Sequence, residues 1–218
     1  MRQLTTIILL IFTIMITSAD KGFCAIRGGL SNSLPIYYNN LSESELLDKG
    51  KVYFHNAMML KNGEINEDMT QALNIYTILQ NVNPENIDYP IALGRLYDKL
   101  GKDRYAKGGF SRAIAVNPAN SKAYFYFGEY YYSRNLYRKA LKYYNEALKN
   151  GFETNYDLLY KMGDVYEKLG DTRSALKYLK DAEKQSPNSE LSARIKRVET
   201  ENSVNGVYNR NTRTRIAQ

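Results

Sequence analysis

Residues 93–97 read Leu-Gly-Arg-Leu-Tyr, and the same order of an apolar residue, Gly, two variable residues and Tyr returns at residues 127–131 and 162–166. The repeated glycines stand 34 and 35 residues apart, at Gly94, Gly128 and Gly163. A period of this length is typical of proteins built from repeated helix pairs, because one such pair with its turns needs about 20 to 50 residues. The sequence therefore predicts a repeat protein.

Each repeat also has a second half in which small and large residues alternate at fixed distances from the Gly. A small residue follows 12 positions later, a bulky one four further on, and Ala after three more. These positions hold Ala106, Phe110 and Ala113, then Ala140, Tyr144 and Ala147, then Ala175, Leu179 and Ala182. Small residues at the repeated Gly positions and at Ala106, Ala140 and Ala175 let the two antiparallel helices of a unit approach closely. Larger residues such as Tyr97, Tyr131 and Tyr166 fill the space between units. Pro84, Pro118 and Pro187 mark the unit ends, since Pro is tolerated only in the first turn of a helix.

This pattern resembles the tetratricopeptide repeat. The resemblance implies an all-α fold, a right-handed α-solenoid of antiparallel helix pairs in which each pair buries its apolar face only against the next. The chain departs from the family pattern in two ways. The family's Trp position holds Pro90, Tyr124 and Leu159, and Phe152 stands where the third closing Pro is expected.

The repeats divide the chain into predicted segments. These are a signal peptide (1–19), a flexible leader (20–40), a degenerate first unit (41–86), three repeats (87–120, 121–155 and 156–189), a capping helix (190–202) and a disordered basic tail (203–218). In the first unit, 22 residues rather than 12 separate Gly50 from Ala72, so we expect a longer helix and a loop near residues 61–66. That insertion fits either an atypical terminal unit or a dedicated binding loop.

The N-terminus has the pattern of an export signal. Arg2 precedes a run of 14 apolar and Thr residues, Leu4 to Thr17. This run is shorter than the ~20 residues of a membrane-spanning helix but suits a signal peptide, with cleavage after Ala19. We therefore expect a protein exported to the periplasm or cell envelope, or secreted, with no stable membrane span after cleavage, and infer a bacterial source. An uncleaved N-terminal anchor is the alternative.

The residue inventory argues against an enzyme. His55 is the one histidine and Cys24 the one cysteine, so neither a catalytic set nor a metal site can be assembled in the repeats, and no cofactor is expected. The formal charge is +7, but Lys and Arg are scattered among acids rather than gathered in a stripe. We therefore expect no nucleic-acid partner.

The resemblance also implies a concave groove, lined by residues one, two, five and eight positions after the Trp position. These are Ile91, Ala92, Arg95 and Asp98, then Phe125, Tyr126, Glu129 and Tyr132, then Tyr160, Lys161, Asp164 and Glu167. The predicted partner-binding residues are Arg95, Phe125, Tyr126, Glu129, Tyr132, Tyr160, Lys161 and Asp164. We expect Tyr97, Tyr131, Tyr137, Tyr144 and Tyr166 to be packing residues. For the four aromatic residues of the groove, both binding and simple packing remain open.

The expected function is a non-catalytic module that binds a protein or peptide in this groove. One version of the family clamps acidic C-termini with Lys and Asn, but this chain has Ile91 and Arg95, then Phe125 and Glu129, at those positions, so the clamp is not reproduced. The alternative is a self-associating scaffold subunit of an envelope complex, with the first unit or the last helix as its contact.

Overall fold

The computed structural model describes residue 38 and residues 41–216, with side chains to residue 203. The chain divides into two compact units, Met1–Ser42 and Glu43–Gln218, and the second carries the repeats. The predicted signal peptide lies outside the described residues, as does all of the predicted leader except Tyr38.

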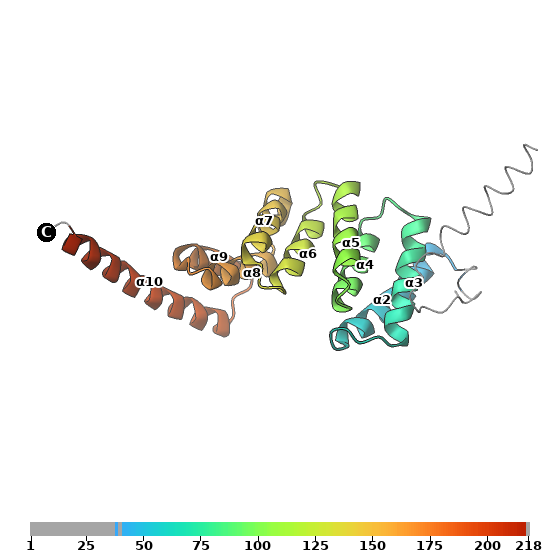
Figure 1. The fold of residues 1–218 in the computed structure, drawn as a ribbon, viewed down its shortest axis with the longest axis horizontal. Coiled ribbons are helices and arrows are strands. Elements are labelled where there is room, and N and C mark those ends of the chain that lie inside the picture. Colours follow the sequence, from blue (N-terminus) through green and yellow to red (C-terminus); the bar gives the residue numbers. More distant parts are fainter. Residues whose placement is uncertain (1–37, 39–40, 217–218) are drawn as a thin grey trace, which may run out of the picture. The chain divides into compact units, whose positions relative to one another are not determined.

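Helices in the second unit pair in the order of the sequence (Figure 1). The pairs are α2 (Glu43–Met59) with α3 (Glu67–Val82), α4 (Asp88–Lys99) with α5 (Asp103–Val116), α6 (Ser121–Tyr132) with α7 (Tyr137–Ala147), and α8 (Tyr156–Lys168) with α9 (Thr172–Gln185). The second helix of each pair packs on the first helix of the next, and α10 (Ser189–Ile216) packs on α9. No strand occurs in residues 41–216. The predicted fold class, an all-α solenoid of antiparallel helix pairs, is confirmed.

Polar side chains start most of these helices. A side-chain oxygen at the N-cap accepts a hydrogen bond from the backbone N–H three residues later, which satisfies one of the free donors of the first turn. The caps are Asn66, Asn120, Asn155, Asp171 and Asn188. Local sequence thus fixes where the helices begin.

The glycines of the repeat motif allow the two helices of a pair to approach. A Cβ added at Gly94 would lie 2.8 Å from the ring of Phe110, and one at Gly163 would lie 2.6 Å from Leu179. Real Cβ atoms do not approach other atoms so closely, so a larger residue would push the helices apart. The predicted role of these glycines is therefore confirmed.

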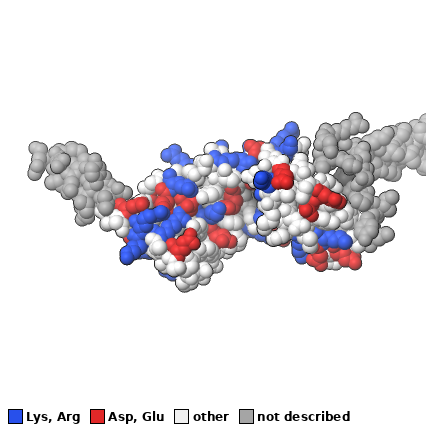
Figure 2. All heavy atoms as spheres, turned by 90° about the horizontal axis from the view of Figure 1, so that it is seen from below, with Lys and Arg blue, Asp and Glu red and all other residues white. Residues whose placement is uncertain are grey.

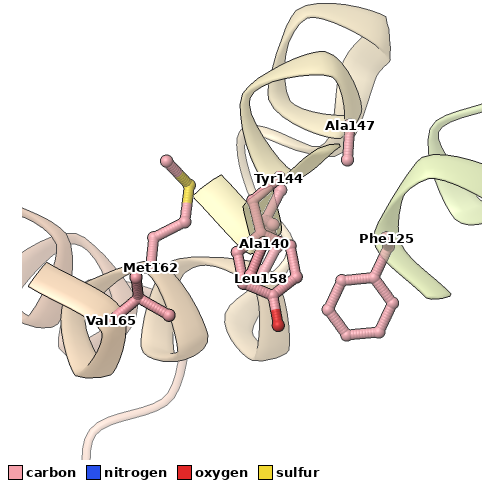
Figure 3. Close-up of a cluster of buried hydrophobic side chains, with 7 residues drawn as sticks. All are labelled: Phe125, Ala140, Tyr144, Ala147, Leu158, Met162 and Val165. Carbon is pink, nitrogen blue, oxygen red and sulfur yellow. The ribbon is translucent and has the colours of Figure 1, made fainter. Parts of the chain in front are cut away.

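The space between successive pairs is filled by large side chains, as Figure 3 shows for three consecutive helices. The cluster consists of Phe125 on α6, Ala140, Tyr144 and Ala147 on α7, and Leu158, Met162 and Val165 on α8. Tyr144 and the α8 residues have no exposed surface. Each pair therefore depends on the next for its burial, and stacking is cooperative.

Helix α7 ends without the closing Pro of the other units. It runs into a wide π-turn, η2 (Leu148–Phe152), in which Gly151 has a φ of 96°. This left-handed conformation suits Gly and stops the helix. Phe152, in the Pro position, packs edge-on against Phe125 with 6.0 Å between ring centroids.

The C-terminal helix is longer than predicted. A capping helix over 190–202 and a disordered tail from residue 203 were expected, but α10 continues to Ile216. Pro187 is the last proline, so no residue with a fixed φ interrupts the helix.

Candidate functional site

The first helices of the pairs share one register, and α10 follows it too. In α8 the buried residues Leu158, Met162 and Val165 are spaced by four and three positions. In α10 the buried residues Leu191, Ile195 and Val198 have the same spacing and pack against α8 and α9. Thus α10 occupies the place of a first helix in a fifth unit. The residues two and five positions after its Trp-equivalent position are Arg194 and Arg197.

The same register applies to α2, with Gly50 at the motif position. It assigns Leu47, Asp48, Lys51 and Phe54 to the groove. The residue five positions after the Trp position is then charged in every unit. We call this set the central row: Lys51, Arg95, Glu129, Asp164 and Arg197.

Arg95 is the one member of the central row that lies between two aromatic rings. Its guanidinium carbon is 4.8 Å from the ring centroid of Phe54 and 4.4 Å from that of Tyr126. Phe54 comes from the preceding unit and Tyr126 from the following one. Cation–π attraction holds such an arrangement together. Among the described residues Arg95 takes part in no ion pair.

Two hollows meet at the Arg95–Tyr126 contact. The smaller, about 250 Å³, is lined by Leu47, Lys51, Phe54, Tyr76, Asn86, Asp88, Tyr89, Ile91, Ala92, Arg95, Lys122 and Tyr126. The larger, about 670 Å³, is lined by Met58, Asn62, Gly63, Arg95, Asp98, Lys99, Gly101, Phe110, Tyr126, Glu129, Ser133 and Arg134. The first-unit insertion borders the larger hollow, and its Gly63 N–H donates to the Lys99 carbonyl at 2.8 Å.

The larger hollow lies where the contacts between units are interrupted. In the neighbouring units, the residue eight positions after the Trp position contacts the residue five positions after it in the next unit, as Phe54 contacts Arg95 and Tyr132 contacts Asp164. The corresponding residues here are Asp98 and Glu129, which are both acids. Asp98 pairs instead with Arg134, at 2.7 Å. Burial raises the pKa of Asp98 even though Arg134 opposes the shift. Two carboxylates therefore border this hollow: Asp98, held by Arg134, which also pairs with Asp103 at 2.5 Å, and Glu129 of the next unit.

Glu129 is held by a residue of its own unit and by one of the following unit. Lys161 Nζ lies 2.9 Å from one carboxylate oxygen, and the Tyr144 hydroxyl donates to the other. Lys161 also lies over the ring of Tyr132, 4.3 Å from its centroid. Burial, and then the charge of Glu129, raise the pKa of Tyr144. These contacts tie α6, α7 and α8 together.

Asp164 is held from both sides by charged or hydrogen-bonding groups. The Tyr132 hydroxyl donates to it, and Arg194 of α10 pairs with it at 2.5 Å. Burial raises its pKa, but the hydrogen bonds from Tyr132 and Arg194 outweigh burial and leave the pKa below its usual value. Glu167 pairs with Arg194 at 2.9 Å and with Arg197 at 2.6 Å.

The side chain of Tyr160 is covered by the same arginine. The Arg194 guanidinium carbon is 4.9 Å from its ring centroid, and Tyr156 stacks on it at 5.9 Å. A hollow of about 540 Å³ remains beside this contact, lined by Tyr156, Tyr160, Asn188, Glu190, Leu191, Ala193, Arg194 and Arg197. Helix α10 thus forms one wall of this part of the groove, and Arg194 covers the Tyr160 ring that a ligand would otherwise contact.

Two family models match the repeats, at residues 91–152 and 157–189, and both describe the tetratricopeptide repeat. These segments are tetratricopeptide repeats. No curated protein matches the chain significantly.

Solved structures with tetratricopeptide repeats share the fold. PilF of Pseudomonas aeruginosa is similar with a TM-score of 0.59 and 15% identity, over 73% of this chain and 71% of that one. The protein TTC0263 of Thermus thermophilus is similar with a TM-score of 0.58 and 17% identity, over 76% of this chain and 85% of that one. PilW, a type IV pilus biogenesis factor, is similar with a TM-score of 0.54 and 21% identity, over 68% of this chain and 69% of that one. At these identities the likeness establishes the fold alone.

The predicted groove residues of the tetratricopeptide repeats divide into three groups. Arg95 and Tyr126 line the two central hollows. Contacts between units engage Glu129, Tyr132, Tyr160, Lys161 and Asp164. Phe125 was expected in the groove but is a core residue, 9% exposed, because Tyr144 and Phe152 pack against its ring. Phe54, Arg134 and Arg194 were not predicted. Applying the groove spacing to α2 would have found Phe54.

The repeat surface mixes charges of both signs. On the face in Figure 2, Lys and Arg lie among Asp and Glu rather than in a patch of one sign. Over the described residues there is no cluster of His, Cys, Asp and Glu suited to a metal ion. Nor does any helix in that part of the chain have the length and apolar character needed to cross a membrane.

Proposed function

We propose that this protein is a non-catalytic module that binds a peptide segment of a protein partner in the groove around Phe54, Arg95 and Tyr126. The observation that carries the proposal is the pair of hollows, about 250 and 670 Å³, that share Arg95 and Tyr126 in their walls. Rings with few rotatable bonds suit peptide contact, because they offer apolar area with little loss of side-chain entropy.

The rest of the predicted site serves the scaffold in this proposal. Tyr132, Lys161 and Asp164 are engaged with neighbouring units, and Arg194 covers Tyr160. A ligand there would have to break ion pairs that are largely shielded from water. Binding next to Arg95 breaks no ion pair.

We also propose that the protein is exported to the cell envelope, in the periplasm or beyond it. The support is the apolar run from Leu4 to Thr17 with small residues before the cleavage position Ala19. Expression with a reporter enzyme active only outside the cytoplasm tests this proposal. Activity that depends on residues 1–19 is expected, and activity in their absence contradicts it.

Self-association through the first unit is a second candidate, favoured by one observation. Val52 is 60% exposed, whereas Leu96 and Val165 at the same register have no exposed surface. The positions of α2 that correspond to the buried Leu158 and Met162 of α8 hold the polar residues Glu45 and Lys49, which do not favour an apolar interface. Light scattering over a concentration series decides, since a monomer at all concentrations excludes this candidate.

The groove proposal is tested by partner recovery from the native envelope. Wild type, Tyr126→Ala and Tyr105→Ala are compared, because Tyr105 is a half-exposed tyrosine on α5 that lines none of the hollows. The proposal expects the partner that wild type captures to be lost with Tyr126→Ala and kept with Tyr105→Ala. Equal recovery with all three proteins contradicts it.

A further inference from the structure

We propose that the ligand of this groove presents a carboxylate to Arg95, with apolar residues next to it in its sequence. This inference rests on the proposed function and adds the chemical class of the ligand. It concerns one cation, two rings and the two hollows that meet there.

The first step is the charge balance of the groove. Lys51 pairs with Asp48 at 3.0 Å, and the other acids at groove positions each have a basic partner. Arg95 is the exception within the described residues, because its contacts are aromatic. Lys99, which also lines the larger hollow, is likewise in no ion pair there. The charge left uncompensated beside this hollow is therefore positive.

The second step is the chemistry of the guanidinium group. A guanidinium carries five N–H donors in one plane, a geometry that matches the two oxygens of a carboxylate. Phe54 and Tyr126 attract the cation through their π-faces but offer it no carboxylate oxygen. The rings also limit the positions of the side chain, so less entropy is lost when a carboxylate binds.

The third step is the apolar surface next to this cation. The smaller hollow brings apolar side chains up to Arg95, from Leu47, Phe54, Ile91 and Ala92. A carboxylate that enters with apolar neighbours would thus bury area at the same time as it meets the charge. The two lysines that line this hollow are already paired: Lys51 with Asp48 at 3.0 Å and Lys122 with Asp88 at 2.5 Å.

A basic ligand is the opposite possibility, because Asp98 and Glu129 border the larger hollow. Each already has a cation within 3 Å: Arg134 at 2.7 Å from Asp98 and Lys161 at 2.9 Å from Glu129. A basic ligand would have to displace these partners while lying close to Arg95. The charge balance therefore favours the acidic ligand.

The test is an NMR titration of the full-length ¹⁵N-labelled chain with four peptides. The first is acetyl-Ala-Leu-Glu-Leu-Ala-amide; the second and third replace Glu by Gln and by Lys. The fourth is the Gln peptide with a free C-terminal carboxylate. We expect the Glu peptide to bind wild type about tenfold more tightly than the Gln peptide, as for a hydrogen-bonded charge pair. Tighter binding of the fourth peptide than of the Glu peptide would place the carboxylate at a chain end.

Variants link the preference to the residue. Arg95→Gln should bind the Glu and Gln peptides equally, and Arg95→Lys should keep part of the preference because it keeps the charge without the planar fork. Arg112→Gln removes an exposed charge of α5 that lines none of the hollows, and should leave the preference intact. Circular dichroism checks that each variant is folded.

Three results would overturn this inference. They are equal binding of the Glu and Gln peptides by wild type, a preference for the Lys peptide, or an undiminished acidic preference in Arg95→Gln. Equal binding near Tyr126 leaves the proposed peptide groove intact and removes only the carboxylate. No binding of any peptide, together with partner recovery by Tyr126→Ala, removes both proposals.

Discussion

The two halves of the groove use the same repeat positions for different purposes. In the open half, Arg95 lies between Phe54 and Tyr126, beside two hollows. In the closed half, Asp164 lies between Tyr132 and Arg194, and α10 covers the surface. A cation between two rings keeps its N–H donors for a ligand. The carboxylate of Asp164 already accepts hydrogen bonds from the Tyr132 hydroxyl and the Arg194 guanidinium. We therefore propose that the position of a residue in the repeat places it in the groove, and that its neighbours decide whether it is available to a ligand.

Two aspartates show the same contrast in their electrostatics. Burial raises the pKa of Asp98 in the open half, although Arg134 opposes the shift. In the closed half, Tyr132 and Arg194 overcome the effect of burial and lower the pKa of Asp164. The closed half thus stabilises its carboxylate, and the open half does not.

The largest expected effect is on stability in the closed half. Arg194→Ala leaves Asp164 and Glu167 without their shared partner, in a place where the Arg194 side chain is 15% exposed. Removing one partner of such a shielded pair should lower the free energy of unfolding by about 2–3 kcal/mol. Urea denaturation measures it. Arg197→Ala, at a side chain 59% exposed, is the matched control and should cost less than about 1 kcal/mol.

The next effect is on ligand binding in the open half. Tyr126→Ala removes one of the two rings beside Arg95 and a wall of both hollows. Peptide affinity should fall by about tenfold or more, as for a central aromatic contact. Tyr160→Ala is the control from the closed half and should leave affinity unchanged in the same titration. A larger loss of affinity with Tyr160→Ala would reverse the assignment of the two halves.

A smaller effect is expected from one hydroxyl. Tyr132→Phe removes the hydrogen bond to Asp164 and keeps the ring that Lys161 covers. The free energy of unfolding should fall by about 1.5–2 kcal/mol, the lower part of the range for a hydrogen bond to a charged group. In the Arg194→Ala variant, Tyr132→Phe should change the free energy of unfolding by a different amount, because both side chains donate hydrogen bonds to the Asp164 carboxylate. Strict additivity in a double-mutant cycle would show that they act independently.

The smallest effect is a difference of sign with pH. Because the folded-state pKa of Asp164 is lowered, its ionised form stabilises the fold above about pH 4, and this is lost as the pH falls through the lowered pKa. Because that of Asp98 is raised, wild type gains stability as the pH falls through the raised pKa towards about 4. Relative to Asp164→Asn wild type should therefore weaken in acid, and relative to Asp98→Asn it should strengthen. Parallel pH profiles of the two differences would refute the contrast.

The sequence was enough to predict the fold, because its determinants recur. Gly94 and Gly163 meet large side chains of the paired helix, and such contacts repeat at one spacing. The site was less predictable, since it depends on contacts between units. Phe125 is buried by Phe152 of the π-turn, which no local pattern signals. Arg194 was missed because α10 carries Lys196 at the Gly position, so only the burial of its neighbours reveals its register.

The central claim is that the open half binds a ligand and the closed half does not. Arg95 and Arg194 report on the two halves directly, because each has an Nε–H group that NMR detects. Titration of the labelled full-length chain with acetyl-Ala-Leu-Glu-Leu-Ala-amide should shift the Nε–H signal of Arg95 in proportion to bound peptide and leave that of Arg194 in place. A shift of the Arg194 signal with an unmoved Arg95 signal would contradict the account.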